Sequence, residues 1–348
     1  MPMVADASEL GARIREVRLG RGLDQITLAR ACGLDRTALS RVESGERKVT
    51  ALELTRIARA LTVSLIDLVN LPAPDVRAAR RPAVEQADGF EQHAFAADLD
   101  LDRALRDLEQ LRDIGGLRPV DLDFGGCGLD SEDQARVLAR RVRRHLDVGN
   151  APLGDIADAA ADLGLWCRTT EAEVDGRSLT PEPGFGVAVI GAHLEPGRRR
   201  TTVAHEIGHH LSGDTYESSG HYTTSSETEK RIEAFAAELL LPEKVLLENP
   251  EPRRDDLIGV AADYRVSWRL VVTTARRVGV DLGRAESGVT PIDSDFLRVR
   301  GCRPQEDMVP PGLPPAWVKA CVRAWEEGRI TRRRAIEMTL GVLQEDDG

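Results

Sequence analysis

The chain has 348 residues, 41% of them hydrophobic, which is enough for two or three domains with cores of their own. Its formal net charge of −11 excludes a protein that coats nucleic acid over its whole surface. No run of about 18 apolar residues occurs, so we expect no membrane span and no membrane partner.

The cysteines and the N-terminus point to a reducing compartment. The five cysteines are scattered, and none forms a Cys-x-x-Cys pair. This usage favours free thiols over a disulfide framework. The first residues also lack the basic and apolar regions of a signal peptide. We therefore expect a cytoplasmic location.

Residues 8–70 predict a compact domain of five short helices. Asp24 and Asp35 can cap the second and third helices, and Gly33 lies in the short turn between them. Such a pair is typical of a helix-turn-helix. Residues 10–60 hold 11 basic against 6 acidic side chains, a local net charge of +5. This excess favours DNA binding; the alternative is a protein-interaction module with a solvated basic face.

The second and third helices carry the pattern Leu28-Ala29, Gly33 and Leu39-Ser40-x-Val42-Glu43-x-Gly45. Over about 60 residues this resembles the XRE (lambda-repressor-like) helix-turn-helix family. The resemblance implies that the third helix enters the major groove of double-stranded DNA, and that Gln25 contacts the DNA backbone. Arginine suits guanine, and hydroxyl groups suit bases or phosphates. The expected DNA-contacting side chains of the third helix are Arg36, Thr37, Ser40 and Arg41.

Residues 71–130 predict a linker that contains one helix. Residues 71–90 hold three prolines and little periodicity, as a linker does. The apolar residues of 91–114 recur at helical spacing. That helix can pack on a neighbour within the chain or form a contact of a homodimer, which we expect as the oligomeric state.

Residues 131–190 predict two helices and a small sheet. A basic helix over residues 131–148 precedes a second helix that ends at Gly164. Residues 165–169 and 185–190 predict apolar strands. The edge of such a sheet can hold an extended peptide by strand addition. The chain as a whole is then mainly α with a small β-sheet, an α+β fold.

The stretch from Thr202 to His210 contains His-Glu-x-x-His. On a helix His205 and His209 are four residues apart, so both imidazoles project from one face and can share a Zn²⁺ ion. Glu206 can then act as general base towards a metal-bound water. The alternative is a solvated helix with two ordinary histidines. Gly208 inside this helix indicates close packing there.

The helix predicted after residue 226 offers the third ligand that a catalytic zinc site needs. Glu229 follows His209 by 20 residues, and Glu233 lies one turn further on the same face. We assign Glu229 as the ligand and Glu233 as the acceptor that orients a ligand histidine through its other ring nitrogen. The reverse assignment stays open, as does a charged face that holds no metal.

Two segments together carry a second resemblance, His205-Glu206-Ile207-Gly208-His209 and Ala234-Phe235-Ala236-Ala237-Glu238-Leu239-Leu240-Leu241-Pro242. They are similar to the ImmA/IrrE family of zinc metallopeptidases over roughly residues 135–280. The resemblance implies a gluzincin-like domain, which we place at residues 131–280, and a protein substrate such as a helix-turn-helix repressor. The family usually has Asn or Asp where this chain has Glu233.

The remaining segments complete the sequence predictions. The loop before Glu227 contains His221, which we expect to stabilise an oxyanion during catalysis. Residues 281–348 predict a loop-rich connector followed by two C-terminal helices.

The sequence thus predicts a DNA-binding transcription regulator whose zinc peptidase domain cleaves a regulatory protein, either a repressor or the chain itself. Two alternatives remain. The peptidase-like domain can be a sensor that does not cleave, or the chain can be the antitoxin-like partner of a two-gene system.

Overall fold

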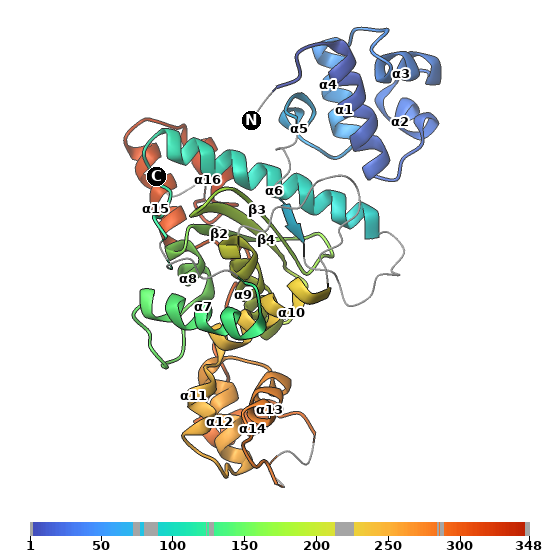
Figure 1. Cartoon of the computed structure of the whole chain (residues 1–348). Helices are drawn as coiled ribbons and strands as arrows, with labels where there is room; N and C mark the ends of the chain where they lie inside the picture. Colours follow the sequence, from blue (N-terminus) through green and yellow to red (C-terminus); the bar gives the residue numbers. More distant parts are fainter. Residues whose placement is uncertain are drawn as a thin grey trace.

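The computed structural model describes residues 3–71, 77–79, 90–122, 124, 129–212, 226–283, 285 and 289–344. The chain is mainly helical with a small mixed sheet, as expected (Figure 1). In the described part of the chain, no helix combines the length and the apolar character that crossing a membrane requires.

The N-terminal domain has the five predicted helices. Asp24 and Asp35 accept hydrogen bonds from backbone N–H groups of the helices they cap, and Gly33 has a φ of 72°, which glycine adopts without strain. Leu39 and Val42 are buried, so the opposite side of the third helix faces solvent. The five helices are α1 (Ala7–Gly20), α2 (Gln25–Cys32), α3 (Arg36–Glu43), α4 (Ala51–Ala60) and α5 (Leu65–Val69).

A mixed sheet with the order β1-β3-β4-β2 forms the centre of the molecule. β2 runs parallel to β4, while β3 is antiparallel to both β4 and β1. The strands are β1 (Arg77–Ala79), β2 (Leu165–Thr170), β3 (Gly176–Glu182) and β4 (Phe185–Gly191). The sequence predicted β2 and β4. It missed β3, because Leu179 is the one large apolar residue in that strand and no alternation marks it.

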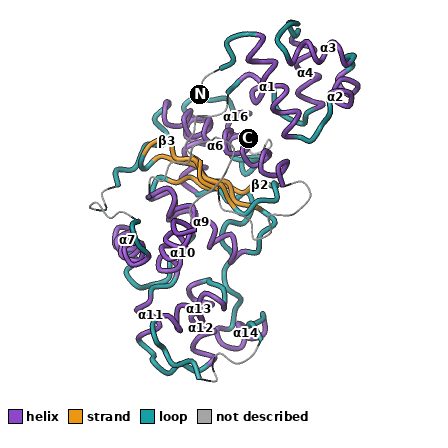
Figure 2. The backbone as a smooth tube through the Cα atoms, turned by 45° about the vertical axis from the view of Figure 1, so that its right-hand side comes forward, coloured by secondary structure: helices purple, strands orange, loops and turns teal. Residues whose placement is uncertain are grey.

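Helices cover both faces of the sheet, which explains why β4 is apolar throughout (Figure 2). On one face α6 (Phe90–Asp113) packs with α15 (Pro315–Glu326) and α16 (Arg332–Met338). Leu101, Leu105 and Leu108 of α6 share a core there with Phe185 and Val187 of β4. The helix predicted in residues 91–114 therefore packs within the chain.

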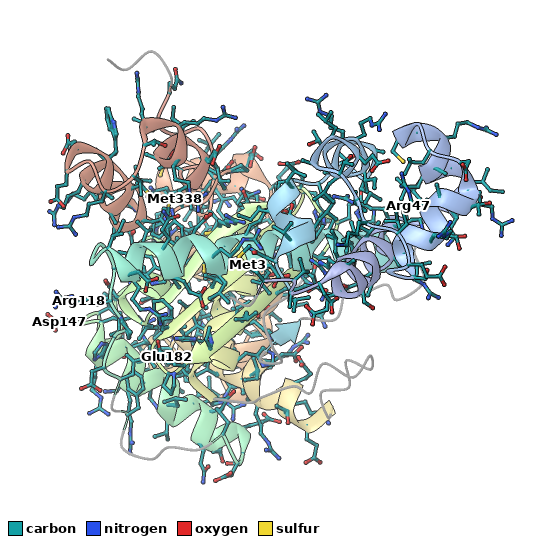
Figure 3. All side chains as sticks on the ribbon, turned by 90° about the horizontal axis from the view of Figure 1, so that it is seen from above. Met3, Arg47, Arg118, Asp147, Glu182 and Met338 are labelled. Carbon is teal, nitrogen blue, oxygen red and sulfur yellow. The ribbon has the colours of Figure 1, made fainter. Side chains whose placement is uncertain are left out.

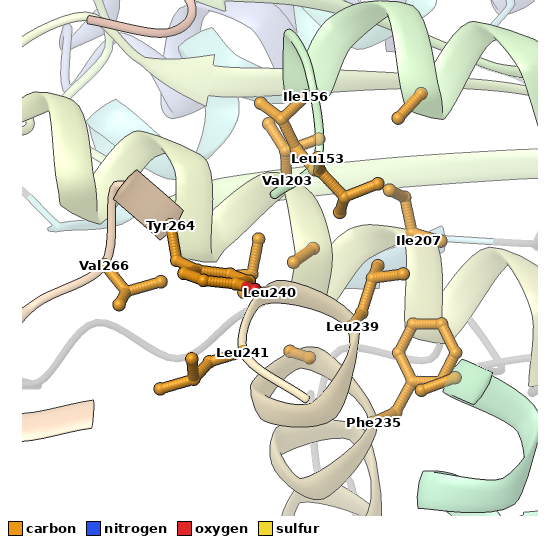
Figure 4. Packing of buried hydrophobic residues seen from close by; sticks show 14 of the residues in the cluster. Leu153, Ile156, Val203, Ile207, Phe235, Leu239, Leu240, Leu241, Tyr264 and Val266 are labelled. Atoms are coloured by element: carbon orange, nitrogen blue, oxygen red, sulfur yellow. The ribbon is translucent and has the colours of Figure 1, made fainter. Parts of the chain in front are cut away.

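The other face is covered by the helices that include the His-Glu-x-x-His segment. They are α7 (Glu132–His145), α8 (Ile156–Asp162), α9 (Pro196–Ser212) and α10 (Ser226–Leu240). Figure 4 shows Val203 and Ile207 of α9 in one core with Phe235 and Leu239 of α10. The two helices therefore pack side by side beneath the sheet.

A further group of helices follows α10 at the lower end of Figure 1. It comprises α11 (Glu243–Leu247), α12 (Arg254–Tyr264), α13 (Trp268–Arg277) and α14 (Asp293–Arg300). The sequence analysis expected a loop-rich connector after residue 280, but the structure has the helix α14 in that segment. This helix buries none of its residues and is held by ion pairs such as Arg298–Asp255 at 2.6 Å and Arg300–Asp263 at 2.6 Å, so no apolar periodicity revealed it.

The helix-turn-helix domain lies against α6, beside the body of the molecule as seen from above (Figure 3). The buried carboxylate of Asp67 accepts hydrogen bonds from Arg103 at 2.5 Å and Arg106 at 2.8 Å. Burial acts to raise the pKa of Asp67, but the hydrogen bonds and charge of Arg103 outweigh it and hold the pKa below its usual value. Gly20 of α1 contacts the ring of Phe95.

α9 and α10 approach each other closely at Gly208. A Cβ atom there would lie 3.1 Å from Ile232 Cγ2 and 3.1 Å from Phe235 Cδ1. These distances are tighter than ordinary van der Waals contact. The close packing predicted at this glycine is confirmed.

Substitution of Gly208 by valine should force α9 and α10 apart. We expect Gly208→Val to lower the free energy of unfolding by about 1–3 kcal/mol, because the three added carbon atoms overpack a filled contact. Gly197→Val is the matched control, since a Cβ atom at Gly197 of the same helix meets nothing within 4 Å. Urea unfolding followed by circular dichroism measures both; equal stabilities of the two variants would contradict the close contact.

Candidate metal centre and the exposed face of α3

Three side chains from two helices converge beneath the sheet. α9 supplies His205 and His209, and α10 supplies Glu229. The two Nε2 atoms lie 3.1 Å apart, and the carboxylate oxygens of Glu229 lie 3.3 Å from His205 Nε2 and 3.7 Å from His209 Nε2. Both histidines are buried, while the Glu229 side chain is 25% exposed. The cluster therefore opens to solvent on the side of Glu229.

This donor set fits zinc. Two imidazole nitrogens and a carboxylate oxygen are the ligands of many catalytic zinc sites. Donors that share one tetrahedral ion at about 2.0–2.2 Å lie roughly 3.3–3.6 Å from one another, close to the separations found here. The ligand atoms all lie within 4.8 Å of one another. The residues present can hold one ion with a position left for another ligand.

Glu206 lies between the histidine helix and β3, fully buried. Its Oε2 accepts a hydrogen bond from the Ser178 hydroxyl at 2.6 Å. Gly176 makes this approach possible, because a Cβ atom there would lie 2.5 Å from Thr202 Cγ2 and 3.1 Å from Glu206 Oε1. The sequence analysis missed Ser178 together with β3. A lone serine in an unrecognised strand carries no signal of its own.

His210 is a structural residue and no part of the cluster. Its Nε2 lies 3.0 Å from the Leu163 carbonyl oxygen, which can only accept, so Nε2 carries the proton. Nδ1 then accepts from the Thr180 hydroxyl at 2.8 Å. Burial lowers the pKa of His210 to about 4, which keeps the ring neutral at neutral pH. The ring ties α9 to β3.

The expectation for Glu233 is corrected. Glu233 is exposed on α10, whereas Ile232 and Phe235 face α9. It lies about 100° around the helix from Ile232, on the exposed side of α10. Among the described residues, no hydrogen-bond partner reaches the buried Nδ1 of His205. The same geometry favours Glu229 over Glu233 as the ligand. His221 lies outside the described residues.

The exposed face of α3 carries the side chains that the sequence analysis expects to contact DNA. All four are solvent-exposed: Arg36, Thr37, Ser40 and Arg41. Gln25, at the first position of α2, is partly buried, and its amide donates to Glu43 Oε2 at 2.8 Å. Glu43 in turn forms a buried ion pair with Arg18 at 2.6 Å. This network fixes α2 and α3 relative to α1.

Comparisons with known proteins agree with both parts of the fold. Residues 14–68 match a helix-turn-helix family of the XRE type, and residues 164–275 match the Peptidase M78 family, described as an IrrE N-terminal-like domain. No protein of curated function matches the chain.

Two solved structures match the chain, one through its sequence identity over a short segment and the other through the share of the chain that it covers. The restriction-modification controller protein C.AhdI from Aeromonas hydrophila is 40% identical over 98% of its own chain and 19% of this one, with a TM-score of 0.18. PlcR from Bacillus thuringiensis, solved with the peptide PapR7 and DNA, is 11% identical over 96% of this chain and 93% of its own, with a TM-score of 0.20. At this identity and TM-score, the comparison with PlcR indicates neither the fold nor the function of this chain. The chain belongs to the XRE-type helix-turn-helix proteins and joins to that domain an M78, IrrE N-terminal-like, peptidase-family domain.

Proposed function

We propose that the chain is a DNA-binding regulator whose M78 domain is a zinc-dependent endopeptidase that cleaves a regulatory protein. The convergence of His205, His209 and Glu229 next to the buried Glu206 is the observation that carries the proposal. A structural zinc site usually has four protein ligands, whereas three ligands and a neighbouring carboxylate are typical of a hydrolytic site.

Each residue of the centre has a role in this proposal. His205, His209 and Glu229 hold the ion; zinc, when bound, supplies Lewis-acid polarisation of a peptide carbonyl and activation of water. Glu206 accepts a proton at its carboxylate and returns it to the leaving amine. Ser178 holds one Glu206 oxygen by its hydrogen bond, which fixes the orientation of the carboxylate. We keep His221 as a candidate for oxyanion stabilisation.

The helix-turn-helix domain gives the peptidase a regulatory setting. The positive N-terminal end of α3 favours approach to the DNA backbone. Arg36 and Arg41 are then available to base edges, with Thr37 and Ser40 for bases or phosphates. A homodimer would place two such helices on a two-fold symmetric operator. The similarity to a controller protein supports a regulatory role, in which cleavage of a repressor or of the chain itself changes transcription.

The first prediction concerns metal content. We expect purified protein to hold about one zinc per chain, and Glu229→Gln to lose most of it, because an amide is a poor zinc ligand. Glu233→Gln is the matched control, with the same substitution one turn along the same helix, and should keep its zinc. Metal analysis by mass spectrometry checks both. Zinc loss in the Glu233 variant with retention in the Glu229 variant would reverse the assignment.

The second prediction concerns catalysis. Glu206→Gln should keep its zinc and its fold but cleave a protein substrate about 10²–10⁴-fold more slowly, because the general base is removed. Candidate substrates are the full chain and helix-turn-helix repressors encoded near its gene, followed by mass spectrometry of the fragments. Unchanged cleavage by the Glu206 variant, or cleavage that resists a zinc chelator, would refute the peptidase assignment.

The third prediction concerns DNA. Arg36→Ala and Arg41→Ala should each weaken binding to a duplex selected from a random-sequence library by about 1–3 kcal/mol, because each removes a base or phosphate contact. Arg59→Ala on α4 is the charge-matched control, since Arg59 is exposed outside α3. Fluorescence anisotropy at fixed salt gives the Kd values. Equal losses for all three variants would mean that only net charge matters.

A further inference from the structure

The outer edge of β3 is covered by a strand from a distant part of the chain. β1 pairs antiparallel with β3, with Arg77 opposite Leu179, Ala78 opposite Ser178 and Ala79 opposite Arg177. β1 belongs to the linker between α5 and α6, about 100 residues before β3. The sheet therefore ends on one side in a short segment that comes from outside the domain.

The linker is longer than the connection requires. α5 ends at Val69 and α6 begins at Phe90, so 20 residues lie between the two helices. Asp67, next to the end of α5, binds Arg103 and Arg106 of α6, and α1 contacts Phe95. Arg103 lies 13 residues after Phe90, or about 20 Å along α6, a distance that about six or seven extended residues would span. The extra length of the linker allows residues 77–79 to reach the edge of the sheet.

The covered edge adjoins the candidate metal centre. Ser178, which lies opposite Ala78 in the ladder, donates to Glu206, and α9 with the histidines packs against β3. Neighbouring strands lie about 4.8 Å apart, so a chain paired with β3 at Ser178 lies one strand spacing from the residue that holds Glu206. A peptide bound at this edge would be placed next to the reacting groups.

We propose that β1 is a built-in occupant of the outer edge of β3 in the resting chain, at the place where an extended segment of the peptide substrate would pair. This inference rests on the proposed peptidase function for the identity of the bound peptide as substrate. Backbone hydrogen bonds recognise the extended conformation of a segment and little of its sequence. A strand of three residues is short enough to be displaced by a longer one.

The proposal is tested by removing the donors of β1 from the full-length chain. Successive N–H groups of a strand point in opposite directions, so either Ala78 or Ala79 donates towards β3. Ala78→Pro/Ala79→Pro removes both N–H groups and therefore removes this donor, whichever of the two residues carries it. Ala83→Pro/Ala87→Pro places two prolines in the same linker after residues 77–79 and is the matched control. The probe is a fluorescein-labelled peptide with the sequence of residues 73–81, and its twin with proline at positions 78 and 79.

We expect the Ala78→Pro/Ala79→Pro chain to bind the labelled peptide about tenfold more tightly than wild type, because apparent affinity falls with the fraction of chains whose edge is open. Amides of residues 176–182 should also exchange with deuterium faster in this variant than in wild type. The control variant should behave as wild type, and the proline twin, which has the same charge, should not bind. Equal affinity of wild type and the strand variant, unchanged exchange at residues 176–182, or equal binding of the twin would overturn the proposal.

Binding and exchange are measured without added zinc, so they separate this inference from the proposed function. If the strand variant gains peptide affinity but neither it nor wild type cleaves any substrate with zinc present, the edge site stands and the peptidase function fails. If wild type cleaves a substrate and the strand variant gains neither affinity nor exchange, the peptidase stands and β1 is no occupant. With both correct, the strand variant cleaves faster at subsaturating substrate.

Discussion

The contact of α9 with α10 at Gly208 is the constraint on which the centre depends. Because Gly208 has no side chain, Ile232 and Phe235 come within van der Waals contact of the α9 backbone. This separation places Glu229, one turn before Ile232, beside the Nε2 atoms of both histidines. A residue that offers no ligand atom thus determines whether three ligands meet.

β3 connects the two halves of the molecule. Arg177 projects to one face and pairs with Asp98 of α6 at 2.9 Å, while Ser178 projects to the other face and binds Glu206. α6 also holds the helix-turn-helix domain through Asp67. α6, which holds the DNA-binding domain, and the candidate centre therefore contact one strand through adjacent residues that point in opposite directions. β1 adds a third contact to the same strand, at its edge, so a change in any of the three reaches β3 directly.

The same arrangement gives the linker a structural meaning. α1 and Asp67 near the end of α5 contact α6 directly, so the linker is not needed to hold the DNA-binding domain in place. Residues 77–79 of the linker lie instead at the edge of the sheet. If the edge binds substrate as proposed, a segment adjoining the DNA-binding domain competes with substrate for the centre.

The sequence by itself determined the local features: the two histidines on one helical face, the caps at Asp24 and Asp35, and the apolar strands β2 and β4. Each depends on residues close together in the chain. The tertiary structure alone decided between Glu229 and Glu233, since residues four apart differ by only about 40° around a helix. Which one meets the histidines depends on how α10 lies against α9. The tertiary structure also decided that β1 and β3 pair and that Ser178 binds Glu206. Their partners are distant in sequence, and the two strands carry too few apolar residues to be recognised from the sequence.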